Sequence, residues 1–385
     1  MFKMKCKSMN YAWGQQGVSS LVSKILTHNS LPFDNNKPYA EYWMGTHING
    51  PSEVYTEDSS TQLISTLINK DLPYLFKVLS IEKPLSIQIH PDIPTATLLN
   101  KAHPDIYKDA NHKPELFIVI SETFELLFGF KSLQRAYNTV LEFKEVFSFK
   151  EAKDFMNSKS TNMYKNLIDK LMTFSESESS TIINQLIELS KLNNNENCKL
   201  IQLLYNNFGD DFGIIIALFM NHIFKTKGDS MYIVANSPHA YIHGNCYEVM
   251  SNSDNVIRLG LTKKFVDRDT FKRICDEKFD EMLYEPSLLI SEHIKTNKNE
   301  VTYHKDKIDD FILKAITIDK VTKMNIDKET VLFIDEGNVE IHFDKNKINA
   351  PLYSSYFIPK ELKDVNIKVI NEDKAKVLLV SEYIN

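Results

Sequence analysis

Apolar residues in the middle of the chain recur at the spacing of a helix. Residues 130–208 contain neither glycine nor proline, the two residues that most strongly interrupt regular structure. Within this stretch apolar side chains return every three or four positions, as at Tyr164, Leu167 and Leu171, which is the period of an amphipathic helix. The pattern predicts a helical domain over residues 131–221.

The regions on either side consist of short runs in which apolar and polar residues alternate, separated by turn residues. Residues 85–90, 116–120, 331–335 and 339–343 are examples. Regularly spaced short strands with tight turns are typical of a β-sandwich or a β-barrel. We therefore predict a mainly β protein with an inserted α-helical domain.

Composition narrows the class of protein. The chain has 385 residues, of which 43% are hydrophobic and 25% charged, and this suits a soluble protein of two or three domains. Its formal net charge of -6 differs from that of nucleic-acid-binding domains, which are usually basic. Because no run approaches the ~18 apolar residues of a membrane helix, we predict no membrane span, and we predict no signal peptide.

The cysteines are widely scattered and form no CxxC pair; they are Cys6, Cys198, Cys246 and Cys275. This spacing argues against a disulfide scaffold and against a metal bound by cysteines. Free cysteines are typical of a reducing compartment, so we expect a cytoplasmic protein.

Residues 85–90 form the most informative of the predicted strands. Alternate side chains of a strand face opposite sides, so Leu85 and Ile87 would lie on an apolar face and Gln88 and His90 on a polar one. In one interpretation the polar face meets water, as in most half-buried strands. In the other it lines a cavity, where Gln88 and His90 bind a metal ion.

Two further segments favour the metal. Glu115 stands at the start of an apolar strand, and His239, Tyr241 and His243 alternate in a second strand-like run. A histidine taken alone is more often structural or exposed than a ligand. Two histidines and a carboxylate at strand ends, however, can hold a divalent metal with an open coordination position. The spacing leaves open whether His239 or His243 would be the second histidine.

Seven segments match, in order, the motifs of one known family. They are Asn10–Gly14, Ala40–His47, Leu75–Ile81, Leu85–Asp92, His112–Glu115, Pro238–Tyr241 and Glu248–Thr262. Through these motifs the chain resembles the type I phosphomannose isomerases, whose fold belongs to the cupin superfamily. The helical stretch and residues 291–385 add little motif evidence of their own.

The resemblance implies cupin-type double-sheet jelly rolls, one catalytic and one C-terminal, plus a helical domain. The catalytic jelly roll would comprise residues 1–130 and 222–290, the helical insertion residues 131–221, and the C-terminal cupin-like domain residues 291–385. The implied reaction is the reversible isomerisation of mannose 6-phosphate and fructose 6-phosphate through an enediol or enediolate, supplying mannose 6-phosphate for GDP-mannose and glycan synthesis. The partner would be a small sugar phosphate, with neither nucleic acid nor membrane involved, and we expect a monomer.

Position by position, the resemblance assigns roles to individual residues. The ligands of one zinc ion (Zn2+) per chain fall on Gln88, His90, Glu115 and His239. The catalytic candidates are Arg258 for the enediolate, Glu248 as base with His47 as second candidate, and Lys113. The candidates for substrate and phosphate contacts are Ser86, Lys77, Lys113, Trp13 and Tyr241, with Trp43 as a further candidate for the cleft wall.

Two positions depart from the family's pattern. His243 stands where the family has serine or glutamine, and it could compete with His239 for the metal. Residues 262–264 read Thr-Lys-Lys where the family has Thr-Pro-Lys.

Two other functions would fit parts of the same pattern. A non-haem iron cupin oxygenase could use His90, Glu115 and His239 as its two-histidine, one-carboxylate triad, although Gln88 as a fourth ligand and the nearby lysines count against it. A non-catalytic sugar-binding cupin would have lost a ligand or Arg258, and all of these residues are present.

Overall fold

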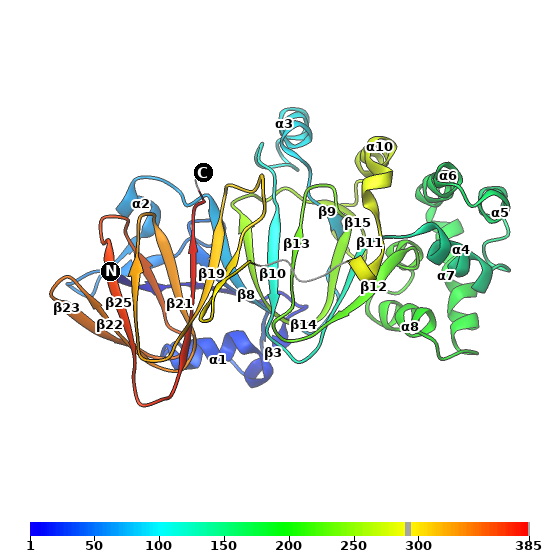
Figure 1. Cartoon of the computed structure of the whole chain (residues 1–385). Helices are drawn as coiled ribbons and strands as arrows, with labels where there is room; N and C mark the ends of the chain where they lie inside the picture. The colour runs from blue at the N-terminus through cyan, green and yellow to red at the C-terminus, as the bar shows by residue number, and fades with distance from the viewer. Residues whose placement is uncertain (289–293, 384–385) are drawn as a thin grey trace.

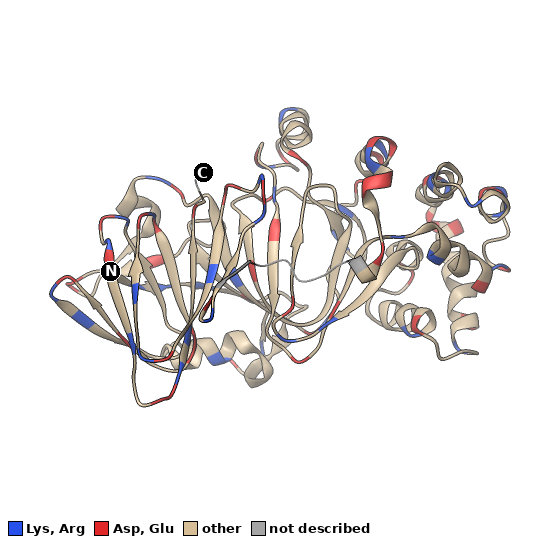
Figure 2. Cartoon of the chain, viewed as in Figure 1, with Lys and Arg blue, Asp and Glu red and all other residues tan. Residues whose placement is uncertain are grey.

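Three regions follow one another along the long axis of the molecule. The computed structural model describes residues 1–288 and 294–383. A group of helices lies at one end, an eleven-stranded sheet lies in the middle, and a nine-stranded and a four-stranded sheet form the other end (Figure 1). Acidic and basic residues are interspersed along the ribbon of all three regions (Figure 2). The predicted boundary at residues 290 and 291 falls outside the described residues.

The middle region carries the strands that matter most for function. Its strands are β2 (Lys7–Met9), β5 (Glu41–Gly45), β8 (Tyr74–Ile81), β9 (Ile87–Ile89), β10 (Glu115–Val119), β11 (Phe124–Lys131), β12 (Met220–Lys225), β13 (Ser230–Ile233), β14 (His239–Ser251), β15 (Ile257–Gly260) and β16 (Leu283–Tyr284). A small two-stranded ladder, β3 (Gln15–Gln16) and β4 (Pro38–Tyr39), lies apart from it. Strands from before and after the helical stretch pair with one another in this sheet, so both parts of the chain build one region.

Strand β14 changes partners half-way along its length. Residues 239–243 pair with β9 and β11, whereas residues 244–251 pair with β8 and β10. The change falls at Gly244, whose φ is +117° and where a Cβ would lie 2.8 Å from the carbonyl oxygen of Thr123. Only glycine fits such a position. The bend lets both halves of one strand contribute side chains to the same interior.

The far end of the molecule consists of two packed sheets. The nine-stranded sheet contains β17 (Ile294–Asn297), β18 (Glu300–Tyr303), β19 (Ile312–Ile318), β26 (Ala375–Ser381), β21 (Thr330–Glu336), β24 (Ser355–Ile358), β1 (Phe2–Lys5), β6 (Glu53–Tyr55) and β7 (Thr61–Leu63). The four-stranded sheet contains β20 (Val321–Asn325), β25 (Asp364–Val369), β22 (Val339–Phe343) and β23 (Asn346–Ala350). Strands β1, β6 and β7, which the sequence analysis placed in the catalytic domain, thus pair within the sheet of the C-terminal region.

An apolar core joins this end to the middle region. The Phe76 ring of β8 packs edge-on against Phe333 of β21, with 6.1 Å between ring centroids, and Tyr247 of β14 packs on the same Phe333 ring at 5.8 Å. The Tyr74 hydroxyl donates to the carbonyl oxygen of Val380 at 2.8 Å. One face of the central sheet is therefore buried against the C-terminal region, and only its other face is available to build a site.

The predicted helical insertion is present. It comprises α4 (Leu133–Glu142), α5 (Lys150–Ser158), α6 (Thr161–Met172), α7 (Glu176–Ser190), α8 (Glu196–Phe208) and α9 (Gly213–Ala217). Its core includes Phe155 stacked on Tyr164, with ring centroids 5.0 Å apart. Met220 and Asn221, at the end of the predicted range, already belong to β12.

In the described part of the chain, four α-helices lie outside this insertion, and the periodicity did not predict them. They are α1 (Leu21–His28), α2 (Ile64–Ile68), α3 (Ile93–Ala102) and α10 (Arg268–Lys278). Helix α3 begins just after β9, where Asp92 accepts a hydrogen bond from the Thr95 backbone N–H. Asp92 is therefore the N-cap of α3, and the strand that leads to His90 cannot continue beyond it.

Candidate metal centre and its surroundings

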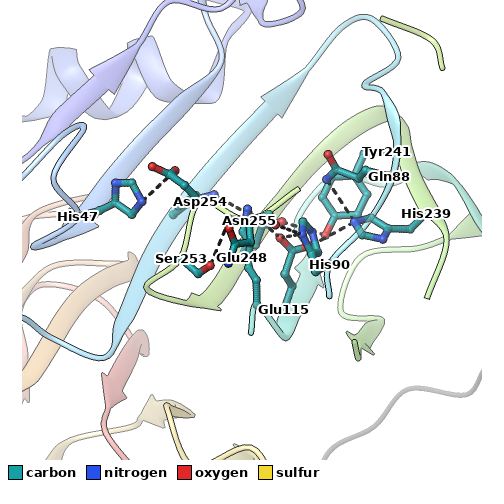
Figure 3. A network of polar contacts seen from close by, with 12 residues as sticks. His47, Gln88, His90, Glu115, His239, Tyr241, Glu248, Ser253, Asp254 and Asn255 are labelled. Atoms are coloured by element: carbon teal, nitrogen blue, oxygen red, sulfur yellow. Dashed lines mark hydrogen bonds and ion pairs between the residues drawn. The ribbon is translucent and has the colours of Figure 1, made fainter. Parts of the chain in front are cut away.

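Two histidines and a glutamate meet in the interior of the middle region. His90 follows β9, Glu115 begins β10 and His239 begins β14; all three are buried, and one ligand atom from each lies within 4.8 Å of the others. His90 Nε2 is 3.2 Å from Glu115 Oε1, and His239 Nε2 is 3.4 Å from Glu115 Oε2 (Figure 3). The fold thus brings together three strand ends that are far apart in sequence.

Backbone carbonyls set the tautomer of both imidazoles. His90 Nδ1 lies 2.8 Å from the carbonyl oxygen of Asn255, and His239 Nδ1 lies 2.9 Å from that of Ser237. A carbonyl oxygen only accepts, so each Nδ1 carries the proton and each Nε2 presents its lone pair toward Glu115. His90 Nε2 is buried without a hydrogen-bond donor. Converging lone pairs and a carboxylate repel one another, and a cation between them removes that repulsion.

Burial and charge keep these groups in the protonation states of metal ligands. Burial lowers the pKa of His90 to about 4, against an opposing effect of Glu115, so its imidazole is neutral at pH 7. Burial by itself disfavours the charge of Glu115, but the Lys113 ammonium beside it favours the ionised form, and the pKa of that carboxyl lies well below its usual value. Neutral imidazole and ionised carboxylate are the forms that bind metal.

Gln88 supplies a fourth group beside the cluster. In the sheet it stands directly opposite His239 of β14 and Arg258 of β15, and paired residues of antiparallel strands project to the same side. Its side-chain Nε2 lies 3.3 Å from His239 Nε2, and a half-turn of the amide places Oε1 at this position. Ser86 Oγ donates to Gln88 Oε1 at 3.4 Å.

A buried chain of polar contacts runs next to the cluster along β14, β8 and β5. Glu248, Lys77 and Trp43 stand opposite one another on these strands. Lys77 Nζ donates to one oxygen of Glu248 at 2.9 Å, and the Tyr241 hydroxyl donates to the other at 3.0 Å. Burial raises the pKa of Glu248 despite the Lys77 charge. The Lys77 ammonium also lies 5.4 Å from the centroid of the Trp43 ring.

Lys113 and Arg258 differ in the partners of their charged groups. Lys113 is buried, with Nζ 3.6 Å from Glu115 Oε1. Arg258 is half-buried, and its guanidinium makes no hydrogen bond or ion pair with any residue in the described ranges 1–288 and 294–383. Burial lowers the pKa of Arg258, though arginine stays charged at neutral pH. Arg258 is thus a cation with free donors beside the cluster.

Three other predicted residues lie further from the centre. His47 Nε2 is 3.1 Å from Asp254 Oδ1, and its Nδ1 accepts from the backbone N–H of Asn49, so both ring nitrogens contact protein groups. Trp13 stacks on Tyr11 with ring centroids 5.8 Å apart. His243 is exposed and is not part of the cluster, so of the two alternatives it is His239 that lies beside Glu115.

Two polar residues of this region received no role from the sequence. Glu41 is buried and accepts a hydrogen bond from Trp43 Nε1. Asp254 receives hydrogen bonds or ion pairs from His47 and Asn49. The available signal for Glu41 was a charged residue at the start of an otherwise apolar strand, and a buried charge is rare unless it is paired.

Comparison with known proteins connects this geometry to a family. Residues 1–133 match the family model described as the catalytic domain of type I phosphomannose isomerase. Mannose-6-phosphate isomerase 1 of Arabidopsis thaliana is 36% identical over 299 residues, covering 70% of this chain and 69% of the relative. The chain belongs to the type I mannose-6-phosphate isomerase family. The resemblance inferred from the motifs is confirmed.

Other family members extend the match to nearly the whole chain. Mannose-6-phosphate isomerase of Saccharomyces cerevisiae is 29% identical over 405 residues, with 94% of each chain covered. A solved phosphomannose isomerase from Salmonella typhimurium superposes with a TM-score of 0.86 over 100% of both chains at 24% identity. A zinc-bound mannose 6-phosphate isomerase structure gives a TM-score of 0.85, also at 24% identity. These structures show that the whole chain, including the helical insertion, has the family's fold.

Among the described residues, no helix is both long enough and apolar enough to cross a lipid bilayer.

Proposed function

We propose that this chain catalyses the reversible isomerisation of mannose 6-phosphate and fructose 6-phosphate with one zinc ion per chain. The observation that carries the proposal is the buried cluster of His90, Glu115 and His239 with Gln88 beside it, in a chain of this family. Nitrogen and oxygen donors that converge from separate strands suit a divalent metal such as zinc.

The donor set also defines what the metal would contribute. Glu115 is the one anionic group among the four. The +2 charge of bound Zn2+ and the -1 charge of this carboxylate would leave the site with a formal charge near +1. When bound, such an ion supplies Lewis-acid stabilisation of negative charge on a sugar oxygen, worth several kcal/mol.

The carbon-bound proton must move between C1 and C2, and Glu248 is our candidate for the base. Lys77 and Tyr241 fix both of its carboxylate oxygens in place, and burial raises its pKa, which makes it a better proton acceptor. A positioned base typically contributes about 10²–10⁴-fold. His47 becomes the weaker candidate, because its ring nitrogens already contact Asp254 and Asn49.

Arg258 and the lysines would handle the negative charge of substrate and intermediate. The free donors of Arg258 suit an enediolate or phosphate oxygen. Ser86 and Lys113 remain our candidates for phosphate contacts. The Lys77 ammonium is buried against Glu248 and the Trp43 ring, which favours orienting the base over binding phosphate.

The aromatic residues would shape the cleft. The Tyr241 ring packs against Phe117 and Phe124 in the interior core, and its hydroxyl donates to Glu248. Tyr241 would therefore form part of the cleft wall and also hold the candidate base in place. Trp13 is only partly buried and packs at the edge of the same core, which suits the outer wall. Neither the similar proteins nor the shared fold supports the alternative hypotheses of an iron oxygenase or a non-catalytic cupin.

The division of the chain into domains, its oligomeric state and its cellular location are further proposals. We propose a catalytic domain from residues 1–130 and 222–290, a helical insertion at 131–221 and a C-terminal domain at 291–385, with β1, β6 and β7 crossing into the last. We propose a monomer in the cytoplasm. All four cysteines are free and buried, which agrees with a reducing compartment.

A coupled assay tests the reaction and the metal together. Purified protein is supplied with mannose 6-phosphate, and fructose 6-phosphate formation is followed before chelation, after chelation and after zinc is added back. Activity that disappears with chelator and returns with zinc supports the proposal. Absence of isomerase activity in protein that contains one zinc per chain would overturn it.

A further inference from the structure

A second layer of hydrogen bonds lies behind the His90 imidazole. His90 Nδ1 donates to the carbonyl oxygen of Asn255 at 2.8 Å, so the position of that carbonyl decides where Nε2 points. Asn255 belongs to the loop of residues 252–256 that joins β14 to β15, and it is 1% exposed. The contacts that fix the Asn255 backbone therefore also fix His90.

The side chains of Asn255 and Asp109 join this part of the loop to the segment before Glu115. Asn255 Nδ2 donates to Asp109 O at 2.8 Å, to Asp109 Oδ1 at 3.0 Å and to Asn111 O at 2.9 Å. The Asp109 carboxylate also accepts from Ser253 Oγ at 2.8 Å and from the backbone N–H groups of Asp254 and Asn111, both at 2.9 Å. All of these partners are neutral donors, so the carboxylate acts as a pure acceptor that organises the loop.

We infer that Asp109 and Asn255 are positioning residues for the metal ligand His90. Together they clamp the 252–256 loop against the segment 109–114 that leads into Glu115. The clamp therefore fixes the carbonyl that orients His90 and joins it to the chain that carries a second ligand. Hydrogen-bond partners of this outer kind typically change metal affinity or activity by about 10–100-fold when they are lost. The inference rests on the proposed function in taking zinc as the metal.

Two isosteric substitutions break the clamp and leave every ligand in place. Asn255→Asp turns the donor that faces three oxygens into an acceptor. Asp109→Asn places an amide N–H donor among groups that are themselves donors. The matched control is Asn252→Asp in the same loop, because Asn252 Nδ2 donates to Leu72 O at 3.0 Å and not to Asp109.

The readout is zinc affinity, measured on the full chain by competition with a chelator. Both clamp variants are expected to bind Zn2+ about 10–100-fold more weakly than wild type, whereas the control stays within about threefold. Circular dichroism at the assay temperature checks that each protein is folded, because lost stability alone would not move the zinc affinity of the folded chain. Zinc affinity within about threefold of wild type in both clamp variants would overturn the inference.

A measurement on the wild type covers the case in which the variants do not fold. In the zinc-free protein, nitrogen NMR of labelled histidine should show His90, assigned with His90→Gln, as the Nδ1–H tautomer. An Nε2–H tautomer would overturn the inference, because the Asn255 carbonyl would then have no proton to accept. Wild-type protein that binds zinc but does not isomerise the sugar would overturn the proposed reaction alone. Wild-type protein that binds no zinc would overturn both.

Discussion

Histidines of one chain take different roles according to the group that meets each ring nitrogen. His90 and His239 each give their Nδ1 proton to a backbone carbonyl and turn Nε2 toward Glu115. His47 instead meets Asp254 through Nε2, and His243 is exposed. The two proposed ligands are therefore distinguished by hydrogen bonds at Nδ1, the nitrogen that does not face Glu115.

Replacement of His90 by alanine should remove zinc and activity together. The side chain provides one of four donors, and its loss should weaken zinc binding by more than the ~100-fold upper range for outer-layer residues. Metal analysis and the coupled assay give the two readouts, and His243→Ala is the matched control. A His90→Ala protein with one zinc per chain and normal turnover would rule out His90 as a ligand.

Replacement of Arg258 by alanine should separate metal binding from catalysis. Zinc should be retained, while turnover falls by about 10²–10³, the range for one lost oxyanion donor. Steady-state kinetics on zinc-loaded protein measures the effect, with the exposed Arg135→Ala as control. A decrease of less than about threefold would remove Arg258 from the mechanism.

At the scale of elements, β14 is the strand on which the site depends. It pairs with four other strands of the same sheet and carries His239, Tyr241 and Glu248. Its two halves reach the same interior because the chain bends at Gly244. Helix α3 is the next element after β9, which holds Gln88, and helix α10 is the next element after β15, which holds Arg258.

Gly244→Ala should destabilise the protein and weaken zinc binding. The positive φ costs about 1–3 kcal/mol for a residue with a side chain, and the added Cβ would also lie 2.8 Å from Thr123 O and 2.9 Å from Phe124 Cδ2. Gly228→Ala is the matched control, because its φ is +91° but no atom lies within 4 Å of the added Cβ. Urea unfolding should show the larger loss for Gly244→Ala; equal losses would contradict the steric argument.

At the scale of the whole molecule, the site region lies between two supports. The helical insertion packs at one end, and the nine-stranded sheet covers one face of the central sheet (Figure 1). The first and the last strand of the chain, β1 and β26, both belong to the nine-stranded sheet. The central strands present Lys77, Glu115 and Glu248 on the other face.

Tyr74→Phe should reveal how strongly the two β regions are coupled. The buried hydroxyl donates to Val380 O, in the C-terminal sheet, at 2.8 Å, and its loss leaves a buried carbonyl with fewer partners, at a cost of about 1–2 kcal/mol. Urea unfolding measures the free energy, with the exposed Tyr55→Phe as control. Stability unchanged within experimental error would show that this hydrogen bond does not couple the regions.

The sequence by itself determined the residue types of the site and the class of each region. Periodicity separated helices from strands because it is a local property, set by which face of an element is buried, and motifs singled out His90, Glu115 and Arg258. The tertiary structure alone decided which partners these residues meet. Lys77 reaches Glu248 across 171 positions, Asn255 reaches Asp109 across 146, and β1 joins the C-terminal sheet. Such contacts depend on how strands are ordered in a sheet, and no local pattern encodes that order.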